Sequence, residues 1–224
     1  MMKAIIFGSI GTIVETSELQ RRAFNRAFEA NGLDWFWTQA TYRELLASNG
    51  GLDRIAEYAV AKRQSVDAEA LHERKGLEFH RLMGTEPLYL RPGVANVVTA
   101  ARRLGIKLGL ATATSIQNVD TLMRETPGIE AHYFDFVGHA GLVQRGKPHP
   151  DIYHLALSEL GIASSDAIAV EDSETSMQAA LDAGLSCLAF PGEMHAHNAF
   201  RGATSRLSKL SFQQVVGTPE LVSS

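Results

Sequence analysis

The chain has 224 residues, of which 45% are hydrophobic and 21% are charged, and its formal net charge is -4. This composition is typical of a globular protein that can bury a sizeable core. No basic patch interleaved with aromatic residues stands out, so the composition argues against nucleic acid as a partner. The single cysteine, Cys187, cannot form an internal disulfide, and the N-terminal apolar run ends at Glu15, too early to cross a bilayer. We therefore expect a cytoplasmic protein with no membrane partner. No feature of the sequence requires an oligomer, so we expect a monomer.

The first predicted element is a short apolar strand at residues 4–7, which runs into a turn containing Gly8 and Gly11. Residues 16–85 then contain helical runs and no convincing strand. Apolar residues recur there at helical spacing in four stretches, at 22–28, 42–46, 55–59 and 71–82. We predict a four-helix cap at 16–85, with hinges near 15–17 and 86–89, inserted into a core formed by 1–15 and 86–224. Ligands of open parallel sheets bind at the carboxyl ends of the strands, so an insert leaving from such an end would cover the site.

After residue 86, short apolar runs alternate with amphipathic runs of helical length. The predicted strands lie at 107–112, 134–138, 167–171 and 186–190, and the predicted helices at 93–104, 115–125, 150–160 and 174–183. Apolar strands separated by helices predict an α/β fold, with a parallel sheet covered on both faces. Ser173 can cap the helix that starts at 174, Gly184 can end it in a left-handed conformation, and Pro150 fits a first helical turn.

Polar side chains suited to a phosphate follow these strands. Thr112 would offer a hydroxyl, and the helix after it would offer free N–H groups and a positive dipole end. Lys147 would supply a positive charge to the phosphoryl oxygens. Glu171 and Asp172 would supply the hard oxygen ligands that Mg²⁺ prefers. Each residue alone has an ordinary structural explanation, but together, in this order at strand ends, they indicate a phosphate site.

The order of hydroxyl, lysine and acidic pair resembles the haloacid dehalogenase superfamily. The usual first motif there is Asp-x-Asp-Gly-Thr, and Gly11-Thr12 matches its second half. The closer resemblance is to the CbbY-like branch, relatives of β-phosphoglucomutase, and it covers nearly the whole chain. It is carried by Glu15-Thr16, Arg22-Ala23-Phe24-Asn25, Gly32-Leu33-Asp34-Trp35, Leu90-Arg91-Pro92-Gly93-Val94, Lys147-Pro148-x-Pro150-Asp151-Ile152-Tyr153 and Glu171-Asp172-Ser173.

The resemblance implies a Rossmann-like core, a helical cap, Mg²⁺, and hydrolysis of a sugar phosphate through an aspartyl-phosphate. For the CbbY-like branch the implied substrate is a pentulose bisphosphate of the xylulose type. It also implies that Thr112, Ala113 and Lys147 bind phosphate. In the cap, residues 50–54 resemble the substrate-selecting loop of that branch, and Gly51 and Arg54 are its candidate ligand residues. Leu52 stands where that branch usually has a lysine, and a surface helix charge is the alternative interpretation of Arg54.

Two departures fall on the reacting positions. The family's nucleophile would be an aspartate at Gly8, and its general acid/base would be an aspartate at Ile10. Glycine has no side chain, so residue 8 cannot supply a nucleophile. Isoleucine cannot carry a proton, and proton transfer by a general acid or base is typically worth ~10²–10⁴ in rate. Of residue 10, only the backbone carbonyl could still reach a metal. Residues 8 and 10 share one face of an extended strand, so we expect the side chain of Ser9 to point out of the site.

We therefore predict a phosphatase-like protein that binds a small phosphorylated sugar but has lost aspartyl-phosphate catalysis. Mg²⁺ binding should be weak or absent, because Asp172 remains with only Glu171 and the Ile10 carbonyl as further candidate metal ligands. The alternative is an active phosphatase in which Lys147, Thr112 and a metal at Asp172 orient a water without a covalent step. A receiver-type signalling domain is disfavoured, because its acidic pair lies at the first strand.

Two other features invite functional interpretations. His195 and His197 are spaced like a metal-binding pair, but no third donor lies nearby in the sequence, and a polar loop is the preferred interpretation. Trp35 and Trp37 could form a binding platform, and packing inside the cap is the simpler expectation.

Overall fold

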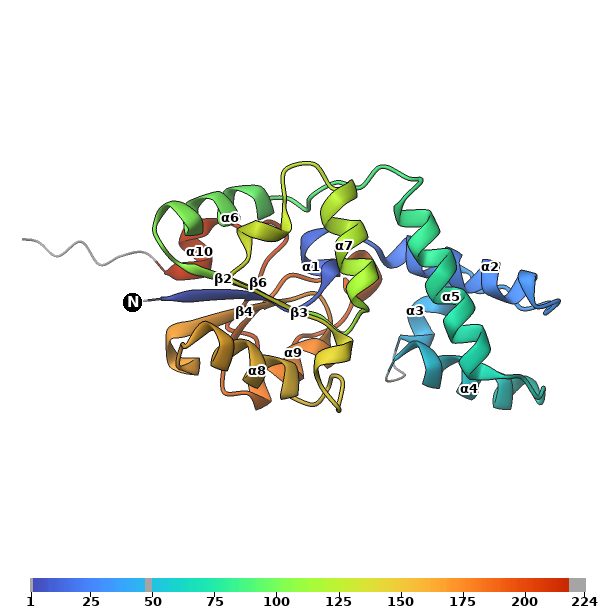
Figure 1. The fold of residues 1–224 in the computed structure, drawn as a ribbon. Helices are drawn as coiled ribbons and strands as arrows, with labels where there is room; N and C mark the ends of the chain where they lie inside the picture. Colours follow the sequence, from blue (N-terminus) through green and yellow to red (C-terminus); the bar gives the residue numbers. More distant parts are fainter. Residues whose placement is uncertain (1, 47–49, 218–224) are drawn as a thin grey trace, which may run out of the picture.

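A single parallel sheet organises the larger part of the molecule (Figure 1). The computed structural model describes residues 2–46 and 50–217. Within them, six strands lie in the order β3-β2-β1-β4-β5-β6, and the register pairs Phe7 with Leu110 and Val170. The predicted α/β fold is confirmed. The strands are β1 (Ala4–Phe7), β2 (Lys107–Ala111), β3 (Phe136–Gly138), β4 (Ala167–Glu171), β5 (Ser186–Ala189) and β6 (Ser205–Arg206).

Helices cover both faces of this sheet (Figure 1). On one face, α6 (Val94–Arg103), α7 (Ile116–Glu125) and α10 (Phe212–Val216) pack in the cluster that contains Ile5 and Phe7. On the other, α8 (Asp151–Leu160) and α9 (Glu174–Asp182) pack with Ala4 and Ile6. Alternate residues of β1 thus serve two cores, which explains why the whole strand is apolar.

The predicted helix signals act as expected at α9. Ser173 caps the helix by accepting a hydrogen bond from the backbone of Ser176, and Gly184 follows it with a φ of +77°. Pro150 stands one residue earlier than expected, at the N-cap of α8. The short elements escaped prediction because they are too brief for periodicity to detect. They are α1 (Ile10–Ile13), β6, α10 and the 3-10 turns η1 (Ala131–Tyr133), η2 (Ala140–Leu142), η3 (Ser164–Asp166) and η4 (Glu193–His195).

The four expected insert helices lie beyond the carboxyl ends of the strands (Figure 1). They are α2 (Ser17–Ala30), α3 (Gln39–Leu45), α4 (Gly51–Lys62) and α5 (Ala68–Met83). They have their own apolar cluster, in which the fully buried Trp37 packs 4.7 Å from the rings of Phe24 and Phe28. Trp35 joins the same cluster, so both tryptophans are packing residues of the cap. The limits 16 and 85 as domain boundaries stay a prediction.

The two chain crossings between sheet and cap run side by side. Val14 and Leu90 form an antiparallel bridge, and the N–H of Arg91 donates to the carbonyl of Ile13 at 2.8 Å. The carboxylate of Glu15 then accepts the N–H of Ser17 at 2.9 Å. The crossings fall close to the predicted hinges.

Candidate functional site

A cavity of about 500 Å³ lies between the cap and the carboxyl edge of the sheet. Both parts of the molecule line it, as expected for a site covered by an insert. Several of the predicted site residues belong to its lining, namely Ile10, Thr112, Ala113, Asp172, Gly51 and Arg54. Gly8, Lys147 and Glu171 are not part of that lining.

The end of β2 supplies polar groups to the cavity. Thr112 is buried, and its hydroxyl accepts the N–H of Thr114 at 3.3 Å. Ser115 caps α7, whose first turn contributes Asn118 to the lining, and the Asn118 amide donates to the Thr114 hydroxyl at 2.8 Å. The N-terminal end of a ten-residue helix therefore faces the cavity, and helix N-termini favour anions.

The first turn of α4 brings Arg54 into the cap side. In residues 50–54, which resemble the substrate-selecting loop of the CbbY-like branch, Gly50 is the N-cap of α4, with a φ of +106°, and the other four begin the helix. Arg54 is only 7% exposed, so it is not a surface charge. Its Nε donates to the Leu45 carbonyl at 2.8 Å, and its guanidinium lies 5.4 Å from the ring of Tyr42.

Lys75 is a second cation in the cavity, and the sequence analysis missed it. Its Nζ donates to the side chain of Gln20 and lies 4.9 Å from the ring of Phe24. Burial, assisted by the charge of Arg54, lowers the pKa of Lys75 to about 7. One signal could have found it. Lys75 stands four residues from both Leu71 and Phe79, on the apolar stripe of α5, where a lysine is out of place.

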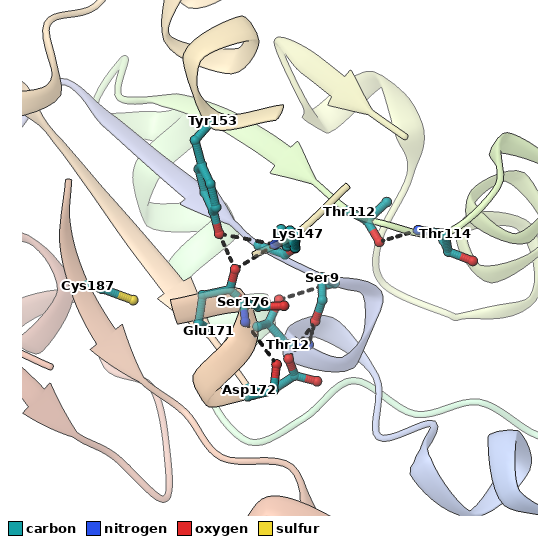
Figure 2. A network of polar contacts seen from close by, with 12 residues as sticks. Ser9, Thr12, Thr112, Thr114, Lys147, Tyr153, Glu171, Asp172, Ser176 and Cys187 are labelled. Atoms are coloured by element: carbon teal, nitrogen blue, oxygen red, sulfur yellow. Dashed lines mark hydrogen bonds and ion pairs between the residues drawn. The ribbon is translucent and has the colours of Figure 1, made fainter. Parts of the chain in front are cut away.

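Lys147, Glu171 and Tyr153 form a closed network at the end of β1 (Figure 2). Lys147 Nζ lies 2.6 Å from Glu171 Oε1 and also donates to the Gly8 carbonyl, while the Tyr153 hydroxyl donates to Glu171. Glu171 is fully buried, and the Lys147 side chain is 3% exposed. Burial raises the pKa of Glu171 to about 7, against the opposing charge of Lys147.

Gly8 leaves room for this network because it has no side chain. A Cβ at residue 8 would overlap the carboxylate of Glu171 and the hydroxyl of Tyr153. The space next to Gly8 is thus filled by two side chains from α8 and β4. Lys147 points into this network.

Ser9 does not point out of the site, so that expectation is wrong. Its hydroxyl donates to Asp172 Oδ1 at 2.9 Å and accepts the N–H of Thr12 at 3.2 Å, and Ser9 lines the cavity (Figure 2). The alternation argument fails because β1 ends at Phe7 and the chain turns into α1, for which Ser9 is the N-cap. Ile10 begins α1, is 4% exposed and joins the apolar cluster on one face of the sheet.

Two further residues shape this edge. Arg91 donates to the carbonyls of Gly11, Phe190 and Pro191 at 2.9, 2.8 and 2.5 Å, which ties the ends of three chain segments together. Of the two histidines in His195-x-His197, only His195 lines the cavity. Burial lowers its pKa.

A sequence model of the haloacid dehalogenase-like hydrolases matches residues 2–184, and the chain belongs to this family. It is similar to the protein CbbY of Cereibacter sphaeroides, with 43% identity over 223 residues that cover 97% of this chain and 95% of the relative. CbbY of Rhodobacter capsulatus is 35% identical, over 98% and 99% of the two chains. These relatives confirm the resemblance to the CbbY-like branch.

Solved structures agree with this assignment. The crystal structure of CbbY from Rhodobacter sphaeroides in complex with phosphate superposes with a TM-score of 0.84 at 42% identity, covering 93% of this chain and 95% of the other. A mutant of the same protein in complex with xylulose-1,5-bisphosphate gives a TM-score of 0.85 with the same identity and coverage. The chain is a phosphatase-like member of a family in which relatives bind phosphate and a phosphorylated sugar.

The family implies Mg²⁺, and the donors at this edge do not fit it well. The described residues contain no group of three or more His, Cys, Asp or Glu side chains placed to hold a metal ion. Asp172 already accepts the Ser9 hydroxyl, Glu171 is held by Lys147, and the Ile10 carbonyl accepts the N–H of Val14. Mg²⁺ requires near-octahedral oxygen ligands and dehydrates reluctantly.

Among the helices of the described residues, none combines the length and apolarity needed to span a bilayer.

Proposed function

We propose that this protein binds a phosphorylated sugar between its cap and its sheet and does not hydrolyse it through an aspartyl-phosphate. One observation carries the proposal. The cavity keeps the cations Arg54 and Lys75 and the polar edge around Thr112, while Gly8 and Ile10 offer no side-chain oxygen to phosphorus. A pocket retained without its nucleophile is suited to binding.

The proposed ligand is a pentulose bisphosphate of the xylulose type, the kind of ligand seen with CbbY of Rhodobacter sphaeroides. A bisphosphate has two anionic ends, and the cavity has two regions suited to them. One is the start of α7, and the other is the cap side with Arg54 and Lys75. The positive charge of Lys75 compensates for the lysine that is usual in that branch at the position of Leu52. A cavity of about 500 Å³ falls within the usual range for small-molecule sites.

Mg²⁺ is proposed to bind weakly, and chiefly together with a phosphorylated ligand that adds oxygen donors. Asp172 is the acidic side chain in the core part of the lining, and Mg²⁺ sites usually combine one or two carboxylates with substrate phosphates. We also propose a cytoplasmic monomer, in keeping with a single free cysteine, Cys187, that is buried.

The test is calorimetric titration with xylulose-1,5-bisphosphate and with inorganic phosphate, on the wild type and on Lys75→Met and Arg54→Met. We expect each substitution to weaken bisphosphate binding by roughly 10- to 100-fold, since hydrogen bonds to charged groups contribute about 1.5–3 kcal/mol. Lys62→Met, at the end of α4 and outside the cavity lining, is the matched control. Absence of bisphosphate binding, or an equal loss in the control, would contradict the proposal.

Turnover is tested separately by phosphate release from the same bisphosphate at high protein concentration. We expect no multiple turnover. Release that persists in Asp172→Ala comes from a contaminant. Multiple-turnover release that requires Mg²⁺ and is lost in Asp172→Ala would favour the metal-dependent alternative.

A further inference from the structure

A second hollow lies on the cap beside α2, with a volume of about 570 Å³. We call it the α2 hollow. One wall is a face of α2 that carries Arg21, Arg22, Arg26 and Glu29, and the other is the segment 33–36. α2 runs from the core to the outer end of the cap (Figure 1). Among the described residues, none lines both this hollow and the cavity between cap and sheet, so a ligand here would occupy a separate site.

The second wall is held firmly and presents an exposed ring. The side chain of Asn25 accepts the N–H of Trp37 at 2.8 Å and donates to its carbonyl at 3.0 Å. Arg21 donates to the same carbonyl at 2.5 Å. Trp35 packs into the apolar cluster of the cap, whereas the next ring, Phe36, is 66% exposed. An exposed ring on a fixed backbone is suited to stacking against a flat ligand.

The three arginines of this hollow differ in their partners. Arg21 forms an ion pair with Glu18 at 2.5 Å, and Arg22 forms one with Glu86 at 2.6 Å. In the part of the chain that the structure describes, the buried Nη1 of Arg26 has no hydrogen-bond partner. Buried N–H groups are ordinarily hydrogen-bonded, and a guanidinium binds anions in preference to neutral acceptors. Arg26 is therefore the cation of this face that is suited to a single anionic group.

Two carboxylates line the same hollow. Glu29 follows Arg26 by one turn of α2, and Asp34 lies on the opposite wall. Carboxylates repel additional phosphates, but they accept hydrogen bonds from hydroxyls, as an acidic residue does for a ribose in dinucleotide sites. The α2 hollow thus combines a cation, hydroxyl acceptors and an exposed ring. A nucleotide with one phosphate can use all three.

We propose that the α2 hollow binds a purine nucleoside monophosphate. The phosphate bonds to the guanidinium of Arg26, the ribose hydroxyls donate to Glu29 and Asp34, and the base stacks on Phe36. A purine offers the larger stacking surface of the two kinds of base. The volume of the hollow falls within the usual range for small-molecule sites. This site is independent of the phosphorylated sugar proposed for the cavity between cap and sheet.

The test is calorimetric titration of the full chain with AMP, and with adenosine, inorganic phosphate and ATP for comparison. We expect AMP to bind about tenfold or more tightly than adenosine or phosphate, because each of these lacks one of the contacts. ATP should bind no more tightly than AMP, since its extra phosphates meet the two carboxylates. An excess of xylulose-1,5-bisphosphate should leave AMP binding unchanged.

Two variants locate the site. Arg26→Met should weaken AMP binding by roughly 10- to 100-fold, as for the loss of hydrogen bonds to a charged group. Phe36→Ala should weaken it by about 5- to 100-fold through the loss of stacking. Arg81→Met is the matched control, because Arg81 is an exposed arginine of the cap that belongs to neither lining. It should bind AMP as the wild type does.

Absence of saturable AMP binding overturns the inference, as does an equal loss in Arg81→Met. Displacement of AMP by xylulose-1,5-bisphosphate, or weaker AMP binding in Lys75→Met, would place the nucleotide in the cavity between cap and sheet. That result rejects the α2 hollow and leaves the proposed function intact. Binding of AMP without binding of the bisphosphate would reject the proposed function alone. The competition experiment uses the wild type, so it does not depend on the folding of any variant.

Discussion

The two sides of the cavity use their charged residues differently. On the sheet side, Lys147 and Glu171 lie 2.6 Å apart, are buried and do not belong to the lining. On the cap side, Arg54 and Lys75 line the cavity, and the Lys75 ammonium is bonded to the amide of Gln20. On the sheet side, the polar side chains beside Gly8 therefore bond to one another. On the cap side, the two cations face the cavity.

The largest effect should come from breaking the buried ion pair between Lys147 and Glu171. Lys147→Met leaves the carboxylate of Glu171 buried without its cation, and removing one partner of a buried ion pair costs about 3–5 kcal/mol. We expect the free energy of unfolding, measured by urea denaturation, to fall by this order. If Lys147 were free to serve a ligand alone, the loss would be small.

The matched variant is the double substitution Lys147→Met with Glu171→Gln. It removes both charges, so most of the lost stability should return. An additive loss in the double variant would contradict the network seen in the structure.

A smaller effect should follow from refilling the space at residue 8. A Cβ there overlaps Glu171 and Tyr153, so Gly8→Ala should lower the free energy of unfolding by about 1–3 kcal/mol. Gly146→Ala is the control, because a Cβ at residue 146 meets nothing within 4 Å. Equal urea midpoints for the two variants would show that the network does not occupy this space. An aspartate introduced at residue 8 would have to displace the same two side chains.

The smallest effect concerns the cap side and pH. The pKa of Lys75 is lowered from 10.5 to about 7, so the ammonium loses its proton as the pH rises above 7. A phosphate monoester, with a second pKa of about 6, is already doubly charged there. Affinity for xylulose-1,5-bisphosphate should therefore fall between pH 7 and pH 8.5, by up to about tenfold, and a change of one pKa unit is about 1.4 kcal/mol. Calorimetry on Lys75→Met should give a flatter profile, and an equally steep one would rule out Lys75 as the cause.

Periodicity predicted the large elements well and the small ones poorly. The apolar run at 167–171 coincides with β4, and the four amphipathic stretches became α2 to α5. Ser9 was misplaced because the alternation rule applies to a continuing strand, and β1 stops two residues earlier. Lys75 was missed because a lysine at one position of a helix carries no motif. Its role depends on which helices pack around it.

The sequence by itself determined the α/β fold, the helical insert and the family, because these depend on periodicity and on residue identity at strand ends. Tertiary structure decided which charges face the cavity. Lys147 and Glu171 form an ion pair beside Gly8, while Arg54, Lys75 and the Ser9–Asp172 pair face the cavity. Side-chain direction at a chain turn and the pairing of buried charges depend on neighbours distant in sequence, and local patterns do not contain that information.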